Sequence, residues 1–264
     1  MNRLSLLVLL AGCDSAVVGG SPDAATPSFD PGTVTGTPQP EPSPPDFVCL
    51  SHVPPTTAPD PLTVAGTVLA MTNGSLVPVP AVELQVFRDG QPVVLGTTTT
   101  DTAGAFSLAA VASGGHPLRA YLKATKLGFR TTFLYPPFPM SANATAVPLP
   151  TITDAAFAAL ASSFGVTQDD HENGVLLVAV ADCKGNPVAG ATLQISHGSS
   201  PAGTVHELGG GQYIVFDVPD GKTHVSATYN GIQLPEHDVK VRAQDPDCTS
   251  PRSTLTATTV IPAP

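Results

Sequence analysis

The sequence contains no tryptophan, few other aromatic residues and few charged ones. Aromatic residues make up 5% and charged residues 12% of its 264 positions, and the 21 acidic side chains outnumber the 11 basic ones. The net charge of −10 argues against a nucleic-acid partner, because phosphate binding requires clustered Lys and Arg. No apolar run reaches the roughly 18 residues of a bilayer-spanning helix, so we expect none.

Proline and glycine are abundant instead, with 29 and 24 residues, and Thr, Val and Ala fill much of the rest. This mixture is typical of short strands joined by many turns rather than of helices. The length allows two small domains with separate cores. The composition therefore predicts an all-β protein.

The first residues have the order of an export signal. The positive charge of Arg3 precedes an apolar run over residues 4–10, and small residues lead to Cys13. The string LAGC that ends at Cys13 resembles the lipobox of bacterial lipoproteins. This resemblance implies a signal peptide over residues 1–12, acylation of Cys13 and a lipid anchor in either membrane of the bacterial cell envelope, on its periplasmic or surface side. The alternative is an ordinary signal peptide with an incidental Cys.

Residues 13–61 have the composition of a linker. PQPEPSPP (38–45) and VPPTTAPDP (53–61) lack donors for a sheet, so we expect a disordered, solvated stalk. A short apolar run, PDFVCLSHV (45–53), interrupts it. We expect this run to dock on the first domain as an edge strand; the alternative is an apolar patch within a loose linker.

Two units of similar sequence follow, over residues 62–150 and 175–264. PVPAVELQV (78–86) in the first unit recurs as PVAGATLQI (187–195) in the second. Three further pairs match in the same order: 96–111 with 203–218, 123–129 with 226–232, and 143–150 with 255–262. Four ordered matches indicate a duplicated module.

The recurring residues suit the roles of a scaffold. Gly104 and Gly211 are expected to take a positive φ in tight turns. Phe106 and Tyr213 are expected to fill each core in the absence of Trp. Alternation along the matched strands predicts four more core side chains: Leu84, Val86, Leu193 and Ile195.

Residues 151–174 are expected to form a short connector that contains the one clear helix. Thr153 or Asp154 can cap its first turn, and Gly165 can end it. Its apolar stripe consists of Phe157, Leu160, Ala161 and Phe164. Because such a stripe needs a surface to cover, we expect the helix to pack on one or both β-domains.

The two units resemble the carboxypeptidase regulatory-like domain. The resemblance covers most of 62–150 and 175–262 and implies two tandem transthyretin-like, Ig-like β-sandwiches of roughly seven strands each. It also implies an accessory or surface role, commonly without catalysis. The residues that carry it include Pro78, Val79, Asp101, Gly104, Phe106 and Gly128, then Gly185, Pro187, Gly211, Tyr213 and Gly231. The second unit departs from the pattern at residues 205–207.

Three cysteines remain after Cys13. Export permits disulfides, and their positions favour a bridge between Cys183 and Cys248 that staples the second sandwich. Cys49 is then either free or the true partner of one of the others. No C-x-x-C motif occurs, which argues against a zinc knuckle or a redox centre.

The histidines gather in the second unit, where His206, His224 and His237 occur together with two tyrosines. No spacing of a metal site links them, so we expect ordinary surface histidines. The acidic run over residues 168–172 lacks the spacing of a calcium loop, so we expect a solvated loop. The sequence therefore predicts no catalytic, metal-binding or cofactor-binding residue.

Together these features indicate an exported, lipid-anchored, non-enzymatic surface protein with a structural or adhesive role. Its expected partners are the membrane, through the anchor, and an unidentified envelope protein or glycan. The alternatives are a metal-dependent enzyme centred on His206 and His224, or a small-ligand carrier. Functional differences between the copies are expected in loops 111–117, 197–203 and 233–254.

Overall fold

The computed structural model describes residues 44–72, 75–169, 171–245 and 254–262, and it confirms an all-β protein. Cys13 and Cys248 lie outside these residues. No helix among the described residues is long and apolar enough to cross a membrane. The first unit contains β1 (Leu62–Thr72), β2 (Ser75–Pro78), β3 (Glu83–Arg88), β4 (Val94–Thr99), β5 (Ala105–Val111), β6 (Ala120–Thr125), β7 (Thr132–Tyr135) and β8 (Ala144–Thr151).

The described residues of the second unit form nine strands of two to nine residues each. They are β9 (Asn173–Val180), β10 (Thr192–His197), β11 (Ser200–Pro201), β12 (Thr204–Gly209), β13 (Gln212–Pro219), β14 (Gly221–Tyr229), β15 (Ile232–Gln233), β16 (His237–Val241) and β17 (Leu255–Val260). A 3-10 turn, η1 (Val48–Ser51), precedes the first unit, and α1 (Asp154–Ser163) separates the two units.

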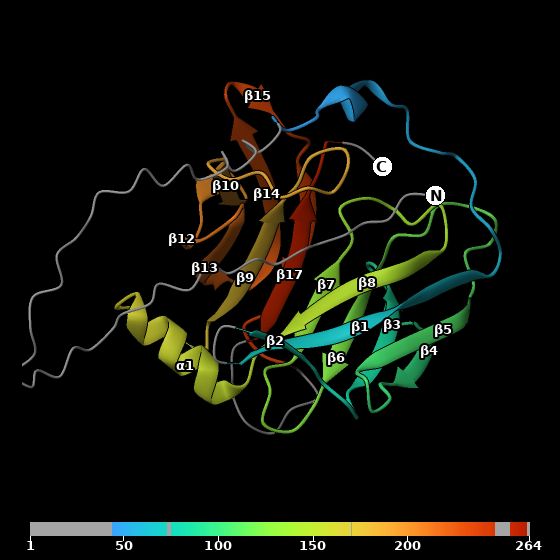
Figure 1. Cartoon of the computed structure of the whole chain (residues 1–264), viewed down its shortest axis with the longest axis horizontal. Coiled ribbons are helices and arrows are strands. Elements are labelled where there is room, and N and C mark those ends of the chain that lie inside the picture. Colours follow the sequence, from blue (N-terminus) through green and yellow to red (C-terminus); the bar gives the residue numbers. More distant parts are fainter. Residues whose placement is uncertain (1–43, 73–74, 170, 246–253, 263–264) are drawn as a thin grey trace, which may run out of the picture.

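One sheet runs through both units. Its eight strands have the order β12-β13-β9-β17-β7-β6-β3-β4, and β17 of the second unit pairs in parallel with β7 of the first (Figure 1). The other sheets belong to single units: β1 with β2, β5 and β8, and β14 with β10, β15 and β16, with β11 on β10. Backbone hydrogen bonds thus join the units directly, in addition to the helical connector that we expected. Pairing β7 with β17 satisfies two strand edges that would otherwise be open.

The two smaller sheets lie on opposite faces of the shared sheet. Strand β6 shows this, because successive side chains of a strand point to opposite faces. Leu122 and Ala124 pack in the core of the first unit, beneath β1, β5 and β8. Tyr121 packs with Phe133 in the core of the second unit, beneath β10 and β14.

The strand pairing of the first unit recurs in the second and confirms the duplication. The pairs β1–β5, β1–β8, β3–β6 and β6–β7 correspond to β9–β13, β9–β17, β10–β14 and β14–β16, with the same direction in each case. Single hydrogen bonds recur as well. The Val68 amide donates to the Gly104 carbonyl at 2.9 Å, and the Val180 amide donates to the Gly211 carbonyl at 2.7 Å. One strand differs, since β4 pairs with β3 whereas its counterpart β12 pairs with β13.

The core side chains expected from the repeat are buried. Phe106 and Tyr213 are each about one-twentieth exposed and lie in different cores. The matched strands bury all four expected residues: Leu84, Val86, Leu193 and Ile195. The repeated sequence therefore marks the same core-facing strand in each unit.

Gly104 and Gly211 each lie close to the backbone of a neighbouring segment, whereas Gly90 has open space around it. Replacement by Ala should therefore cost more stability at Gly104 than at Gly90. The φ values of Gly104 and Gly211 are +71° and +74°, and an added Cβ would lie 2.8 or 2.6 Å from a backbone atom of Val79 or Val188. Gly90 has a similar φ of +73° with nothing within 4 Å. We predict that Gly90→Ala lowers the free energy of unfolding by about 1–2 kcal/mol through φ alone. Gly104→Ala should lower it by about 1–3 kcal/mol more through overlap. Equal losses in urea unfolding would show that the close approach imposes no constraint.

The helix forms as predicted and covers the free face of the second unit. The Thr153 hydroxyl accepts from the Ala156 amide at 3.1 Å and caps the first turn. Gly165, with φ +67°, follows the last turn. Phe157 packs on Phe216 of β13 at 5.8 Å between ring centroids, so α1 lies against the shared sheet opposite β14.

Candidate functional site

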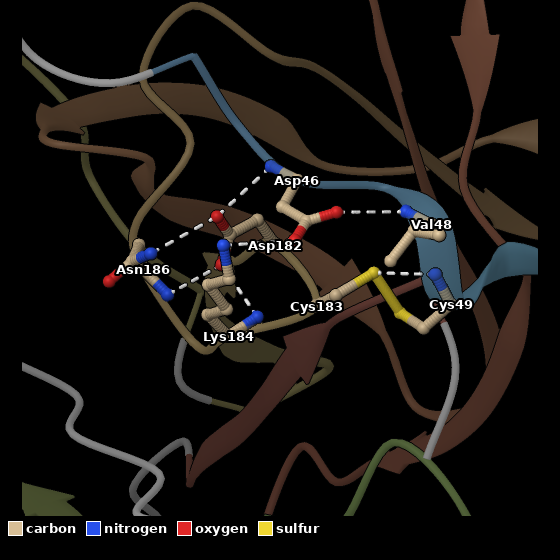
Figure 2. Close-up of polar contacts among 7 residues, drawn as sticks. All are labelled: Asp46, Val48, Cys49, Asp182, Cys183, Lys184 and Asn186. Atoms are coloured by element: carbon tan, nitrogen blue, oxygen red, sulfur yellow. Dashed lines mark hydrogen bonds and ion pairs between the residues drawn. A yellow bond between two sulfur atoms is a disulfide. The ribbon is translucent and has the colours of Figure 1, made fainter.

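The segment before β1 is attached to the second unit through a polar network around Asp182 (Figure 2). The Asp182 carboxylate accepts from the amides of Asp46 at 3.1 Å, Lys184 at 2.9 Å and Asn186 at 2.8 Å. The Cys183 amide donates to the Asp46 carbonyl at 2.8 Å. Burial raises the pKa of Asp182, but these donated hydrogen bonds outweigh it and leave the pKa below its ordinary value. The carboxylate is therefore held ionised as the centre of the attachment.

A disulfide makes this attachment covalent. Cys49 in η1 is bonded to Cys183, with 5.7 Å between their Cα atoms, and its amide also donates to the Cys183 sulfur. The predicted bridge between Cys183 and Cys248 is therefore wrong, and the alternative partner, Cys49, is the one observed. A separation of 134 residues in the sequence hides this neighbourhood.

The apolar run over residues 45–53 docks on a different unit, and in a different form, from those we predicted. It forms the turn η1 on the second unit and not an edge strand on the first. Phe47 stacks near Tyr229 of β14, with 5.7 Å between ring centroids. An aromatic contact and a disulfide hold this run more specifically than edge pairing would, since an edge accepts any strand.

The end of the Pro-rich segment that follows, residues 58–60, is bound to the first unit. The Ala58 amide donates to the Gly115 carbonyl at 3.1 Å, and the Ser113 hydroxyl donates to the Pro59 carbonyl at 2.7 Å. The expectation of a solvated stalk is therefore wrong for residues 45–49 and 58–60, which are bound to the body, whereas residues 50–57 between them are exposed. Proline removes a donor but keeps its carbonyl, so such a segment can still be bound by donors of the body. Residues 13–43 lie outside the described part of the chain.

A buried ion pair crosses the junction of the units. Lys123 of β6 and Asp245, which follows β16, lie 2.7 Å apart, and each side chain is at most 5% exposed. The Thr131 hydroxyl donates to the second oxygen of Asp245 at 2.9 Å. Lys123 is the one charged residue of its strand, AYLKAT, and it is buried there. A charged residue at a strand position of this kind indicates a buried partner, and we did not predict one from the sequence.

A cationic side chain covers the aromatic residues of the junction. Tyr121 stacks on Tyr135 at 5.0 Å between ring centroids, and Phe133 is tilted against it. The Arg242 guanidinium lies 4.9 Å from the Phe133 ring and donates to the Tyr121 hydroxyl at 3.1 Å. Part of the loop expected to carry function, 233–254, thus binds the first unit instead.

The second unit has ionisable residues at the positions of this aromatic stack. The matched pairing of β14 with β16 places His224, Glu236 and Asp238 where β6 and β7 have Tyr121, Phe133 and Tyr135. The His224 Nδ1 lies 2.6 Å from Asp238 and 3.1 Å from Glu236, and the Lys222 ammonium lies 2.7 Å from Asp238. Burial raises the pKa of Asp238, but Lys222 and then His224 bring it below its ordinary value.

The two histidines of the enzyme alternative lie in separate clusters. The His206 ring packs against Phe164 of the connector, at 4.5 Å, and against Phe216. His224 lies instead among the carboxylates of β16. His224, Glu236 and Asp238 form a possible metal-ligand set among the described residues, but the Lys222 ammonium already compensates Asp238.

The acidic run at residues 168–172 forms a turn in its described part. The Asp169 carboxylate accepts from the amides of His171 and Glu172 at 2.9 and 3.3 Å, and Gln168 bonds the Asn173 carbonyl. These bonds close the loop on itself, so its groups stabilise a turn.

His237 predicts a loss of stability on mild acidification. Burial lowers the pKa of its imidazole to about 4, partly opposed by Asp238, and Nε2 lies 2.8 Å from the Thr258 hydroxyl. An unfolded His titrates near 6.5, so the unfolded chain takes up the proton first as the pH falls. The stabilisation is complete above about pH 6.5 and is lost toward pH 4, by roughly 3 kcal/mol.

Urea unfolding at several pH values measures this effect. His237→Gln should flatten the profile between about pH 6.5 and 4, whereas Gln at the exposed His116 should leave it unchanged. The carboxylates with lowered pKa titrate below this window. A profile that stays steep in His237→Gln would contradict the assignment.

Comparison with known proteins adds distant structural similarities. No family model matches the sequence, and no curated protein matches it either. Shaft pilin SpaA from Lactobacillus rhamnosus GG is 13% identical over 79% of this chain and 99% of the pilin, with a TM-score of 0.24. The minor pilin GBS52 of Streptococcus agalactiae is 11% identical over 77% and 97%, with a TM-score of 0.25.

The Bacillus anthracis TIE protein is 12% identical over 76% of this chain, with a TM-score of 0.23, and the match spans a third of its length. TM-scores this low carry no argument about this chain. Its β-sandwich architecture rests on its own strands and their pairing.

Proposed function

We propose that this chain is an exported, lipid-anchored, non-enzymatic protein of the bacterial cell envelope with a structural or adhesive role. Its two β-sandwiches would be modules of the carboxypeptidase regulatory-like kind. The lipobox-like string ending at Cys13 supports the anchor, and an envelope protein or glycan would be bound by the part of the body that faces away from the membrane.

The disulfide between Cys49 and Cys183 is the observation that carries this proposal. Disulfides form and persist in oxidising compartments, which agrees with export. The bond also attaches Cys49, which follows Cys13 in the sequence before either sandwich begins, to the folded body. A lipid on Cys13 would then hold both units through residues 14–43, because the body is joined by one continuous sheet.

Metabolic labelling tests the anchor. Radiolabelled palmitate should enter the wild-type chain and the matched control Cys248→Ser, and it should be absent from Cys13→Ala. The Cys13→Ala variant should also leave the membrane fraction. Palmitate that fails to enter the wild-type chain, together with an unchanged location of Cys13→Ala, would refute the anchor.

A further inference from the structure

An apolar groove lies between the two units on the face of the shared sheet that carries α1. Strand β1 has 11 residues where its counterpart β9 has 8, and its end from Leu69 to Thr72 pairs with β2, beyond the part that pairs with β5. The β1–β2 hairpin and α1 enclose a cavity of about 410 Å³. Apolar side chains from both units and the helix line it, among them Leu69 and Met71 of β1, Leu134 of β7, Leu160 of α1, Leu177 of β9 and Ala257 of β17.

The chemistry of this groove excludes charged groups from its interior. No described residue that lines it is Asp, Glu, Lys, Arg or His, and its polar groups are hydroxyls and the amides of Asn143 and Gln212. Moving an unpaired charge out of water costs far more free energy than hydrogen bonds to hydroxyls and amides recover. The occupant must therefore present an apolar surface.

The strand that borders the groove also argues against a peptide. Strand β8 pairs with β1 along one edge, and its other edge has no strand partner among the described residues. Pro148 and Pro150 alternate with Val147 and Leu149 along β8, and neither proline has an N–H to offer an added strand. The register also slips between Ala144 and Val147. An added strand would thus find a bulged edge that is poor in donors.

We propose that the groove binds one aliphatic chain of a free monoacyl lipid, such as a long-chain fatty acid, with the head group in water. An apolar cavity of about 150 Å³ holds benzene, so 410 Å³ corresponds to roughly 16 carbon atoms. Thr145 and Ala146 are exposed beside the groove, which leaves a path to solvent for the head group. Met71 and Met140 supply flexible side chains that adapt to a chain of variable shape.

A chain-length series tests this assignment on the purified, delipidated full chain carrying Cys13→Ala. Saturated fatty acids of increasing length should displace a fluorescent fatty-acid probe. We expect affinity to rise roughly tenfold for each two methylenes and to level off near 16 carbons, because each buried methylene adds a fixed increment until the groove is full. Affinity that does not depend on chain length would overturn the proposal.

One substitution should shorten the groove. Ala179 of β9 lines it on the same face as Leu177, so Ala179→Leu should weaken binding of the longest chains at least tenfold and move the plateau two to four carbons shorter, about the size of the added side chain. The matched control is Ala109→Leu, at an exposed position of β5 outside the groove, which should change neither. Unfolding curves verify that both variants fold. Unchanged binding by folded Ala179→Leu would overturn the proposal.

A comparison of the acylated wild-type chain with Cys13→Ala distinguishes a free lipid from the chain's own acyl group as the occupant. Equal probe binding by the wild-type chain and Cys13→Ala supports a free lipid as the occupant. Binding by Cys13→Ala alone would show that the groove takes the chain's own acyl group, which overturns the assignment to a free lipid. Palmitate labelling reports on the anchor separately, so either proposal can fail without the other.

Discussion

Replacing Cys49 with Ser is expected to lower the free energy of unfolding by about 4–5 kcal/mol. The bond to Cys183 closes a loop of 134 residues, and the entropy that such a loop loses in the unfolded chain grows with its length. The substitution also frees η1 from the second unit. Urea unfolding in the Cys13→Ala background, with and without a reductant, measures the loss.

Cys248→Ser is the matched control, because the sequence alone favoured a bridge between Cys183 and Cys248. The structure predicts that this variant keeps its stability and remains sensitive to reductant. Stable Cys49→Ser together with destabilised Cys248→Ser would contradict the observed pairing and restore the predicted one.

Removing the carboxylate of Asp245 is expected to cost about 3–5 kcal/mol of unfolding free energy. The side chain lies 2.7 Å from the Lys123 ammonium in the buried junction, and its loss removes a carboxylate that compensates this buried charge. The Thr131 hydroxyl loses an acceptor as well. Denaturant unfolding of Asp245→Ala measures the effect, and a change in the slope of the transition would show that the two units have begun to unfold separately.

Two comparisons separate burial from charge. Lys222→Met removes an ion pair of similar length, but Lys222 is 64% exposed, so the expected loss is about 0–1 kcal/mol. The double variant Lys123→Met with Asp245→Leu should recover most of the stability lost by Asp245→Ala, because apolar side chains often replace a buried pair at little cost. Losses of similar size at both pairs would show that burial does not set the effect.

The features that the sequence predicted well are those decided by near neighbours along the chain. The core face of each matched strand follows from alternation, as at Leu84 and Leu193. Thr153 caps the helix because its hydroxyl reaches an amide three residues on. Gly104 and Gly211 mark turns that need a positive φ. The duplication could be recognised for the same reason, since each match covers a single strand or a strand with its adjoining turn and neighbour.

The features that were missed depend on segments far apart in the sequence. The Asp182 carboxylate closes a turn by accepting from the nearby amides of Lys184 and Asn186, yet nothing local indicated that it would also accept from the amide of Asp46. The same holds for Lys123. Its place in a strand suggested burial, but nothing in the sequence identified Asp245 as its ion-pair partner. His206 and His224 are close in the sequence, but they lie in separate clusters.

By itself, the sequence determined a duplicated all-β chain with a capped helix between two copies, because strand alternation, turn residues and helix caps act over a few residues. Only the tertiary structure decided that Cys49 is the partner of Cys183, that residues 45–49 and 58–60 are bound to the body, and that β7 and β17 join two sandwiches into one sheet. The physical reason is that a strand edge, a thiol and an apolar face accept any suitable partner. Which partner arrives depends on how the whole chain packs.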